Sequence, residues 1–256
     1  MKNLLFRYSL ICSLTMYNMN NMKNLFSRYL LYTLIVVVSL VGAYLFLENQ
    51  QIKAQNNQVL QITKSLRIIK MIAAVDSTRI SIVNKVSTII SKYNSDLDER
   101  TRQEYATEIY KMTLKYDNLD IDLISATITH ESARTWEYDI TSHVGAMGLM
   151  QIMPATGRFL ASQEGIEWTN SKDILYNPIT NIRLGSRYLS MLIAKYSKRM
   201  GRDFAVEAAL AAYNGGEKRV AYWISKNRKY KYLWKETRTY IPRVLDLYAD
   251  FASIAM

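Results

Sequence analysis

The chain has 256 residues, enough for one domain of ordinary size and an appended segment. Cys12 is its only cysteine, so the part of the chain beyond the N-terminal region has no disulfide and depends on its hydrophobic core for stability. The net charge of +11 is a basic balance that favours an anionic partner.

The N-terminal region has the pattern of a membrane segment. Residues 1–28 contain four basic residues and no acidic one, and residues 29–47 contain no charge at all. Nineteen helical residues span ~30 Å, the thickness of the bilayer hydrocarbon. Because the basic residues precede the segment, residues 1–28 are expected in the cytoplasm. The sequence therefore predicts a single-pass protein of the inner (cytoplasmic) membrane, with the rest of the chain on the periplasmic or extracytoplasmic side.

Two features of this region stay open at the level of sequence. Cleavage after Ala43 would instead export the chain, although residues 44–47 continue the apolar run and favour an uncleaved anchor. Residues 1–8 nearly repeat in residues 22–29, so translation starts at either Met1 or Met22.

Residues 48–76 are interpreted as a polar linker and helical stalk. Residues 48–58 are polar, and a heptad-like series of apolar residues overlaps them: Ile52, Val59, Ile62, Leu66 and Ile69. The series covers fewer than three heptads, so a stalk that packs on its own domain is favoured over a coiled-coil dimer.

The body of the chain, residues 77–256, is predicted to be a mainly α domain. It shows little of the alternation that marks strands, and its apolar residues recur at helical spacing. Turns are expected at Ser95-Asp96 and Asp117-Asn118, and Asn177-Pro178 is typical of a helix start. Gly215-Gly216 is expected to end an alanine-rich helix.

The charge of the body favours an envelope polymer over nucleic acid. Four of the 33 Lys and Arg residues lie in the first 28 residues, so the remainder keeps a net charge of +7. The basic residues are scattered, and export would separate the chain from nucleic acid. An anionic envelope polymer or a membrane surface is the expected partner.

Glu131 is the first candidate for chemistry. It lies at helical spacing after Ile121, Ile124 and Ile128, and Asp120 is a suitable N-cap for that helix. At about 100° per residue, Glu131 lies roughly 20° from Ile124. A carboxyl on an apolar face has a raised pKa, which suits a general acid near neutral pH. When Glu131 is considered alone, the simpler interpretation is a glutamate at a helix end that turns to solvent.

Two other kinds of site are excluded. His130-Glu131 begins the His-Glu-x-x-His pattern of zinc proteases, but Arg134 occupies the place of the second histidine. The chain has no Gly-x-Ser-x-Gly nucleophile motif and no glycine-rich phosphate loop. We expect no metal and no cofactor.

Five segments, in order over residues 105–245, resemble the lytic transglycosylase domain of the soluble-lytic-transglycosylase (SLT) type. They are Glu131-Ser132, residues 145–151 (GAMGLMQ), a helix with Asn177-Pro178, Asn181-Ile182, Gly185 and Tyr188-Leu189, residues 212–216 (AYNGG), and residues 236–240 (ETRTY). The resemblance implies a lysozyme-like fold and the peptidoglycan glycan strand as substrate.

The resemblance also implies the roles of particular residues. Glu131 would be the catalytic acid, with Ser132 beside it. The implied substrate-binding residues are Ser132, Ser142, Gln151, Met153, Tyr213, Asn214, Glu236 and Tyr240. Family members have about two fewer residues between the glutamate and the Gly-Ala pair, and the extra length lies in residues 133–136. This departure affects the alignment of Ser142.

The implied reaction uses a single carboxyl. Glu131 would protonate the oxygen between N-acetylmuramic acid (MurNAc) and N-acetylglucosamine (GlcNAc), and would then accept a proton from the C6 hydroxyl as it attacks C1. The product would be a 1,6-anhydro-MurNAc end. Two alternatives remain: a muramidase of the same fold that uses water, with Asp139 as the second carboxylate, or a non-catalytic glycan-binding part of an envelope-spanning machine.

Overall fold

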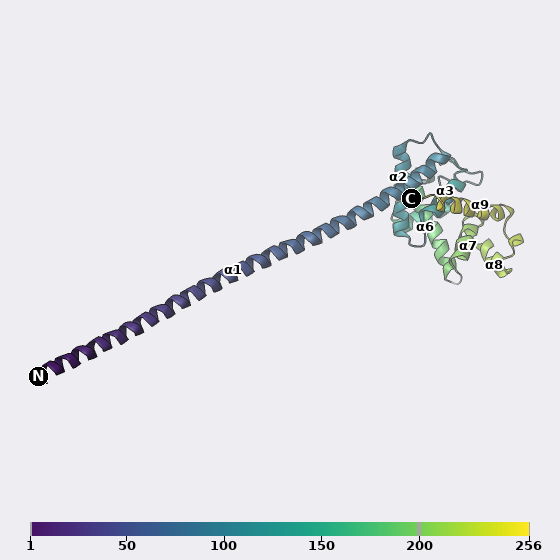
Figure 1. Cartoon of the computed structure of the whole chain (residues 1–256). Coiled ribbons are helices and arrows are strands. Elements are labelled where there is room, and N and C mark those ends of the chain that lie inside the picture. Colours follow the sequence, from purple (N-terminus) through teal and green to yellow (C-terminus); the bar gives the residue numbers. More distant parts are fainter. Residues whose placement is uncertain (1, 199–200, 256) are drawn as a thin grey trace. The chain divides into compact units, whose positions relative to one another are not determined.

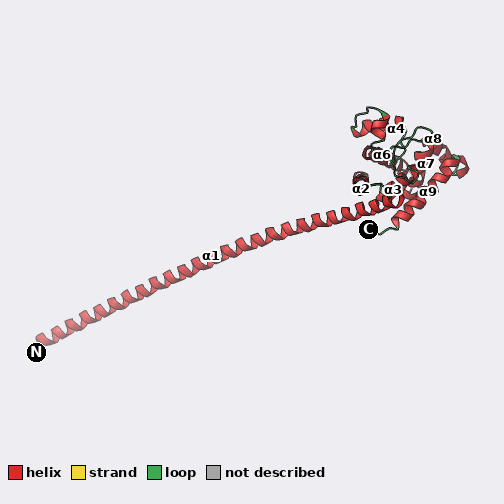
Figure 2. Ribbon diagram, turned by 90° about the horizontal axis from the view of Figure 1, so that it is seen from above, coloured by secondary structure: helices red, strands yellow, loops and turns green. Residues whose placement is uncertain are grey.

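The computed structural model describes residues 2–198 and 201–255, with side chains from Leu10 onward. The chain divides into two compact units, Met1–Ile72 and Ala73–Met256. Within the described residues the elements are helices joined by loops, without a strand (Figures 1 and 2). The mainly α fold predicted from the sequence is confirmed.

The first unit is the N-terminal part of helix α1, Lys2–Tyr93. This helix contains an 18-residue window with a mean hydropathy of 2.5, and none of that window is buried within the structure. By length and composition, α1 is therefore able to cross a membrane. The helix continues through residues 48–72, whose side chains are all exposed.

The second unit contains the end of α1 and the remaining helices. These are α2 (Glu99–Lys115), α3 (Ile121–Glu131), α4 (Pro154–Glu164), α5 (Ser171–Leu175), α6 (Pro178–Ser197), α7 (Arg202–Gly215), α8 (Glu217–Ser225), the 3₁₀ helix η1 (Tyr230–Tyr232) and α9 (Lys235–Ala252).

Side-chain caps set the starts of the helices that carry the predicted motifs. The carboxylate of Asp120 accepts a hydrogen bond from the backbone N–H of Leu123 at 2.8 Å, which begins α3. The Asn177 side chain accepts a hydrogen bond from the backbone N–H of Thr180 at 2.9 Å, and Pro178 occupies the first position of α6. Gly216, with φ at +80°, ends α7. These starts and stops agree with those expected from the sequence.

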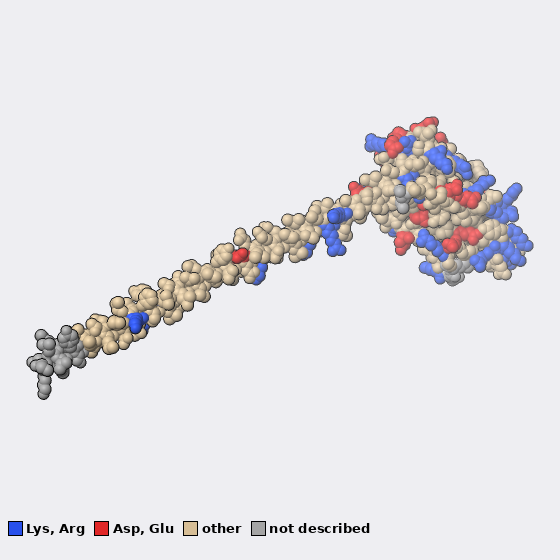
Figure 3. Space-filling view, viewed as in Figure 1, with Lys and Arg blue, Asp and Glu red and all other residues tan. Residues whose placement is uncertain are grey.

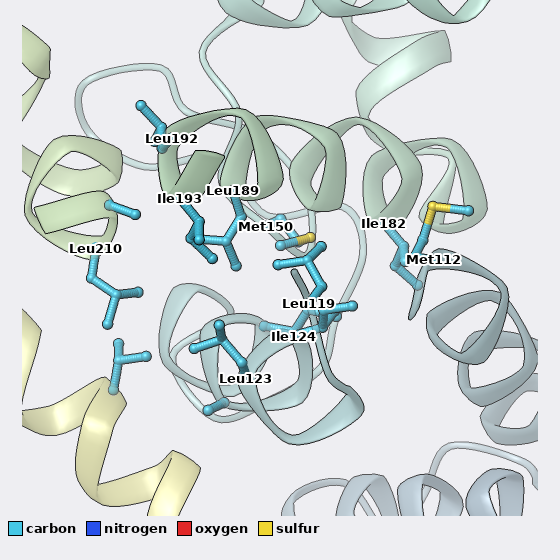
Figure 4. Close-up of a cluster of buried hydrophobic side chains, with 14 of the residues drawn as sticks. Met112, Leu119, Leu123, Ile124, Met150, Ile182, Leu189, Leu192, Ile193 and Leu210 are labelled. Atoms are coloured by element: carbon cyan, nitrogen blue, oxygen red, sulfur yellow. The ribbon is translucent and has the colours of Figure 1, made fainter. Parts of the chain in front are cut away.

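Helix α3 lies at the centre of the core. It packs against α2 and α9, while α6 packs against α2 and α7. Apolar side chains from α2, α3, α6, α7 and the loop before α4 meet in one cluster (Figure 4). Val86, Ile89 and Ile90, near the end of α1, are also fully buried. The last turns of α1 are therefore part of the second unit, within the residues 77–256 that the sequence assigned to the domain.

Gly185 allows α6 to approach the loop that precedes α4. A Cβ atom placed on Gly185 would lie 2.3 Å from Sδ and 2.7 Å from Cβ of Met150. The second contact involves an atom close to the backbone, so a change of rotamer at Met150 would not relieve it. Met150 is itself fully buried.

We predict that Gly185→Ala lowers the free energy of unfolding by about 1–3 kcal/mol, because the added methyl overpacks this contact. Gly201→Ala is the matched control, since a Cβ there meets nothing within 4 Å. Chemical denaturation of both variants measures the effect. Equal stability of the two variants would contradict the close packing of α6 on the loop.

Candidate active site

Glu131 is the last residue of α3, and its side chain is half-buried. Its Oε1 accepts a hydrogen bond from the Tyr240 hydroxyl at 2.7 Å. Burial raises the pKa of this carboxyl from 4.5 to about 7, against the lowering effect of the Tyr240 hydrogen bond, and the charge of Glu236 adds to the rise. A large fraction of Glu131 is therefore protonated near neutral pH. The half-buried side chain and its hydrogen bond to Tyr240 agree with the inward carboxyl predicted from the apolar spacing.

Two tyrosines surround this carboxyl. Tyr240 comes from α9, is 2% exposed and makes an edge-on contact with the ring of His130, with centroids 4.7 Å apart. Tyr213, near the end of α7, donates its hydroxyl to the carbonyl of Met150 at 2.8 Å. Burial and the nearby charge of Glu131 raise the pKa of both tyrosines well above the ordinary value. Both phenols are therefore neutral donors at any working pH.

The loop of residues 141–153 forms the next part of the site. Isolated bridges join Met147 to Thr141 and to Ile152, so the chain folds back on itself within a few residues. The Gln151 side-chain amide donates to the carbonyl of Gly148 at 2.9 Å, and Gln151 has φ at +46°. Such a conformation is uncommon for a residue other than glycine and persists only where its surroundings hold it.

The side chain of Asn181, on α6, holds this loop in place. Its Oδ1 accepts the N–H of Met150 at 2.7 Å, and its Nδ2 donates to the carbonyls of Leu175 at 2.8 Å and Met147 at 3.0 Å. Asn181 is fully buried, so its polar atoms have no water to replace these partners. The sequence placed Asn181 in a family motif without a role. The position of the Asn181 amide inside an apolar helical stripe was the signal that could have indicated a role.

Ser142 and Met153 lie at the two ends of this loop. The Ser142 hydroxyl accepts the backbone N–H of Ala146 at 3.0 Å, and Met153 is 44% exposed just before α4. The hydrogen bonds of Ser142 and Gln151 therefore shape the loop itself, and the Met153 side chain remains exposed.

Asn214 joins the end of α7 to the start of α9. Its Oδ1 accepts the Thr237 hydroxyl at 2.7 Å, and its Nδ2 donates to Oε1 of Glu236 at 3.4 Å. Gly215 makes this approach possible, because a Cβ there would lie 2.7 Å from the Thr237 Oγ1. The structure therefore brings Asn214 and Glu236 together, and this contact fixes the helix that carries Tyr240.

Ser132, which the sequence placed among the substrate-binding residues, is fully buried behind Glu131. Its hydroxyl accepts the backbone N–H of Trp136 at 3.1 Å, and the Trp136 indole donates to the Thr129 hydroxyl at 3.1 Å. Ala133, Arg134 and Trp136 all have positive φ values, between 52° and 70°. Ser132 therefore braces the strained, longer loop after α3.

The remaining polar side chains near Glu131 do not assemble a metal site. In the part of the chain that the structure describes, no three His, Cys, Asp or Glu side chains gather closely enough to hold a metal ion. His143 and Asp139 are both exposed in the loop between α3 and α4.

Residues 108–234 match the family model described as the transglycosylase SLT domain. This part of the chain belongs to that family. It contains Glu131, the loop, Tyr213 and Asn214, and it ends just before the α9 residues of the site. The lysozyme-like fold expected from the resemblance is confirmed by the solved structures below.

The named relatives of this chain are lytic murein transglycosylases. The chain is 32% identical over 141 residues to the soluble lytic murein transglycosylase of Escherichia coli K12, which covers 55% of this chain and 20% of that protein. It is 33% identical over 122 residues to membrane-bound lytic murein transglycosylase C of Actinobacillus pleuropneumoniae serotype 5b, covering 47% and 32%. The matched segment thus spans a third or less of these relatives.

The chain also resembles solved structures of lytic transglycosylases. The lytic transglycosylase Slt of Pseudomonas aeruginosa, in an inactive mutant, aligns with a TM-score of 0.50 at 30% identity, over 61% of this chain and 25% of that one. A 70-kDa soluble lytic transglycosylase in complex with bulgecin A aligns equally well, over 60% and 25%.

The raised pKa of Glu131 predicts a pH-dependent effect of Glu131→Gln on stability. The folded state keeps the proton up to about pH 7, whereas the unfolded state loses it near pH 4.5, so the parent loses stability across this interval. The glutamine variant has no such loss. Its advantage in unfolding free energy should grow by about 3 kcal/mol from pH 4.5 to above pH 7.

Denaturant unfolding at several pH values measures this difference. Glu137→Gln, which replaces an exposed carboxylate in the following loop, is the control and should follow the parent at every pH. A constant difference between Glu131→Gln and the parent would mean that this carboxyl is not desolvated.

Proposed function

We propose that this protein is a membrane-anchored lytic transglycosylase that cleaves the β-1,4 bond between MurNAc and GlcNAc in peptidoglycan and leaves 1,6-anhydro-MurNAc ends. The observation that carries the proposal is the desolvated carboxyl of Glu131, which accepts a hydrogen bond from Tyr240 inside an SLT domain. The names of the relatives agree with the reaction.

In the first step, protonated Glu131 gives its proton to the glycosidic oxygen as the bond from C1 to that oxygen breaks. A pKa of about 7 keeps the proton available and still permits its transfer. The acetamido oxygen of the same sugar stabilises the positive charge that develops at C1. The Tyr240 hydroxyl stabilises the new Glu131 carboxylate, since its hydrogen bond favours the charged form.

In the second step, the C6 hydroxyl of MurNAc attacks C1, and Glu131 accepts the hydroxyl proton. The carboxyl is then protonated again, and water, metal and cofactor take no part. A ring-closing attack needs no second carboxylate to activate a nucleophile, and proximity lowers its barrier. The site is compatible with this step, because the nearby carboxylate of Glu236 is held by the Asn214 side chain.

The remaining predicted residues would bind the strand. Ser142 would contact the acetamido group, Gln151 and Met153 would line the sugar subsites, and Tyr213 would lie beside the reacting carboxyl. Asn214 and Glu236 would support α9 from the other side. Support comes from their arrangement: Gln151 and Tyr213 are both fixed to the loop of residues 148–150 by hydrogen bonds.

We predict that Glu131→Gln folds and still binds glycan strands. Its rate of cleavage should fall by about 10²–10⁴-fold, the usual contribution of a general acid. Clearing of a peptidoglycan suspension measures the rate, and sedimentation with insoluble peptidoglycan measures binding. The inactive Pseudomonas enzyme of known structure carries a glutamate-to-glutamine replacement as well.

Asp139→Asn is the matched control, because it removes an exposed carboxylate from the same loop. This variant should keep the parent rate. If Asp139→Asn lost activity as completely as Glu131→Gln, a water-using muramidase with two carboxylates would replace the proposal. If Glu131→Gln cleared peptidoglycan as fast as the parent, the protein would be a glycan-binding component without this catalytic acid.

The membrane would hold the enzyme through residues 29–47, with the domain on the periplasmic or extracytoplasmic side. The exposed apolar window of α1 and the membrane-bound relative support this placement. The substrate would be the only polymer partner required, with no nucleic acid. An envelope-spanning machine would be a further partner of such an anchored enzyme.

We predict that the full chain stays with the membrane fraction after an alkaline wash, whereas a chain that begins at residue 48 is released. The domain of the full chain should be digested by a protease added outside the cytoplasmic membrane. A mature chain that begins at Tyr44 and lies in the soluble fraction would show instead that residues 29–43 are a cleaved signal.

A further inference from the structure

Residues 217–238 concentrate the positive charge of the domain. This segment contains eight Lys and Arg residues and two glutamates, so it holds +6 of the net +11. Glu217 pairs with Lys195 of α6, and Glu236 is held by Asn214. Among the described residues, none of the eight basic side chains forms an ion pair. Figure 3 shows blue side chains gathering at the end of the domain where Figure 1 places α8.

Aromatic contacts fix this basic segment to the domain. The Arg219 guanidinium lies 3.5 Å from the centre of the Trp234 ring, and it donates to the carbonyl of Tyr232 at 3.4 Å. Trp223 of α8 is 1% exposed and stacks on Phe204 of α7. Helix α8, η1 and the start of α9 therefore form one ordered surface, which we call the basic ledge. It comprises residues 217–238.

The ledge ends at the helix that holds the catalytic carboxyl. Trp234 occupies the N-cap position of α9, and Tyr240, whose hydroxyl donates to Glu131, lies six residues further along the chain in the same helix. At 1.5 Å per residue this separation is ~9 Å along the helix axis. The last part of the ledge and the tyrosine that contacts Glu131 therefore belong to the same helix, within two turns of each other.

We propose that the basic ledge binds the carboxylates of the peptide stems on the glycan strand, and so makes the enzyme prefer strands that still carry peptides. This inference rests on the proposed function and adds a specificity to it. Lys226, Lys229 and Lys231 have no acidic partner among the residues that the structure describes, and would find one on the peptides. Attachment at Glu131 and at the ledge would be two contacts on one chain, so the second costs little extra entropy.

A membrane surface is the other anionic partner for such a patch. The observations favour the strand, because the ledge is continuous with α9 and thereby with the reacting group. Binding to a membrane would not need that continuity.

Carboxylate recognition through exposed lysines is sensitive to salt, since charges at the surface are screened.

The test compares two substrates: glycan strands that carry peptides, and the same strands after an amidase has removed the peptides. The ledge variant is the triple replacement Lys226→Glu, Lys229→Glu and Lys231→Glu. Its control is Lys92→Glu, Lys172→Glu and Lys198→Glu, which makes the same change of charge at exposed lysines elsewhere. Both are made in the full chain, and circular dichroism checks their folding.

We expect the parent to have a lower KM for peptide-bearing strands than for stripped strands, a preference that added salt reduces. The ledge variant should raise KM for peptide-bearing strands about tenfold, as expected for the loss of three exposed ion pairs and the repulsion that replaces them. It should leave kcat and the KM for stripped strands within about twofold. The control variant should behave as the parent.

Equal KM values of the parent for the two substrates, or equal losses by the ledge variant on both, would overturn the ledge. The ledge would also be overturned if the triple variant kept its preference but lost binding to vesicles of phosphatidylglycerol and phosphatidylcholine, because the patch would then belong to the membrane. If the parent cleaved neither substrate, the proposed function itself would be overturned, and this result differs from those that overturn the ledge.

Discussion

The hydrogen bond between Tyr240 and Glu131 connects the core of this domain to its chemistry. It joins α3, the central helix, to α9, the last helix, across 109 positions of sequence. Burial alone would keep the carboxyl protonated, and a carboxyl that never ionises is a poor acid. The tyrosine offsets part of this effect by stabilising the carboxylate. The resulting pKa of about 7 suits the proposed role, in which one residue serves first as acid and then as base.

Much of the remaining structure holds that pair in place. The contact of Asn214 with Thr237 fixes the start of α9, and with it the position of Tyr240. The Asn181 amide fixes the loop whose Met150 carbonyl accepts the Tyr213 hydroxyl. Ser132 and Trp136 brace the strained loop on the other side of Glu131. Buried polar groups that are fully paired specify one arrangement, which an apolar core of the same volume would not do.

The sequence predicted the helices well, because their signals are local. Asp120, Asn177 and Gly216 occupy the caps that their residue types favour, and the apolar spacing of α3 correctly turned Glu131 inward. It could not predict which distant group would meet that carboxyl. Tyr240 and Asn181 act through contacts between helices, and their roles depend on packing that no local pattern records. The burial of Ser132 was missed for the same reason.

We propose that the sugar's own C6 hydroxyl, and not water, completes the cleavage that Glu131 begins. Digestion of peptidoglycan in water enriched in oxygen-18, followed by mass spectrometry of the released muropeptides, tests it most directly. We expect 1,6-anhydro-MurNAc ends that contain none of the heavy isotope. Reducing MurNAc ends that carry one oxygen-18 atom would contradict it, because they would show that water attacks C1.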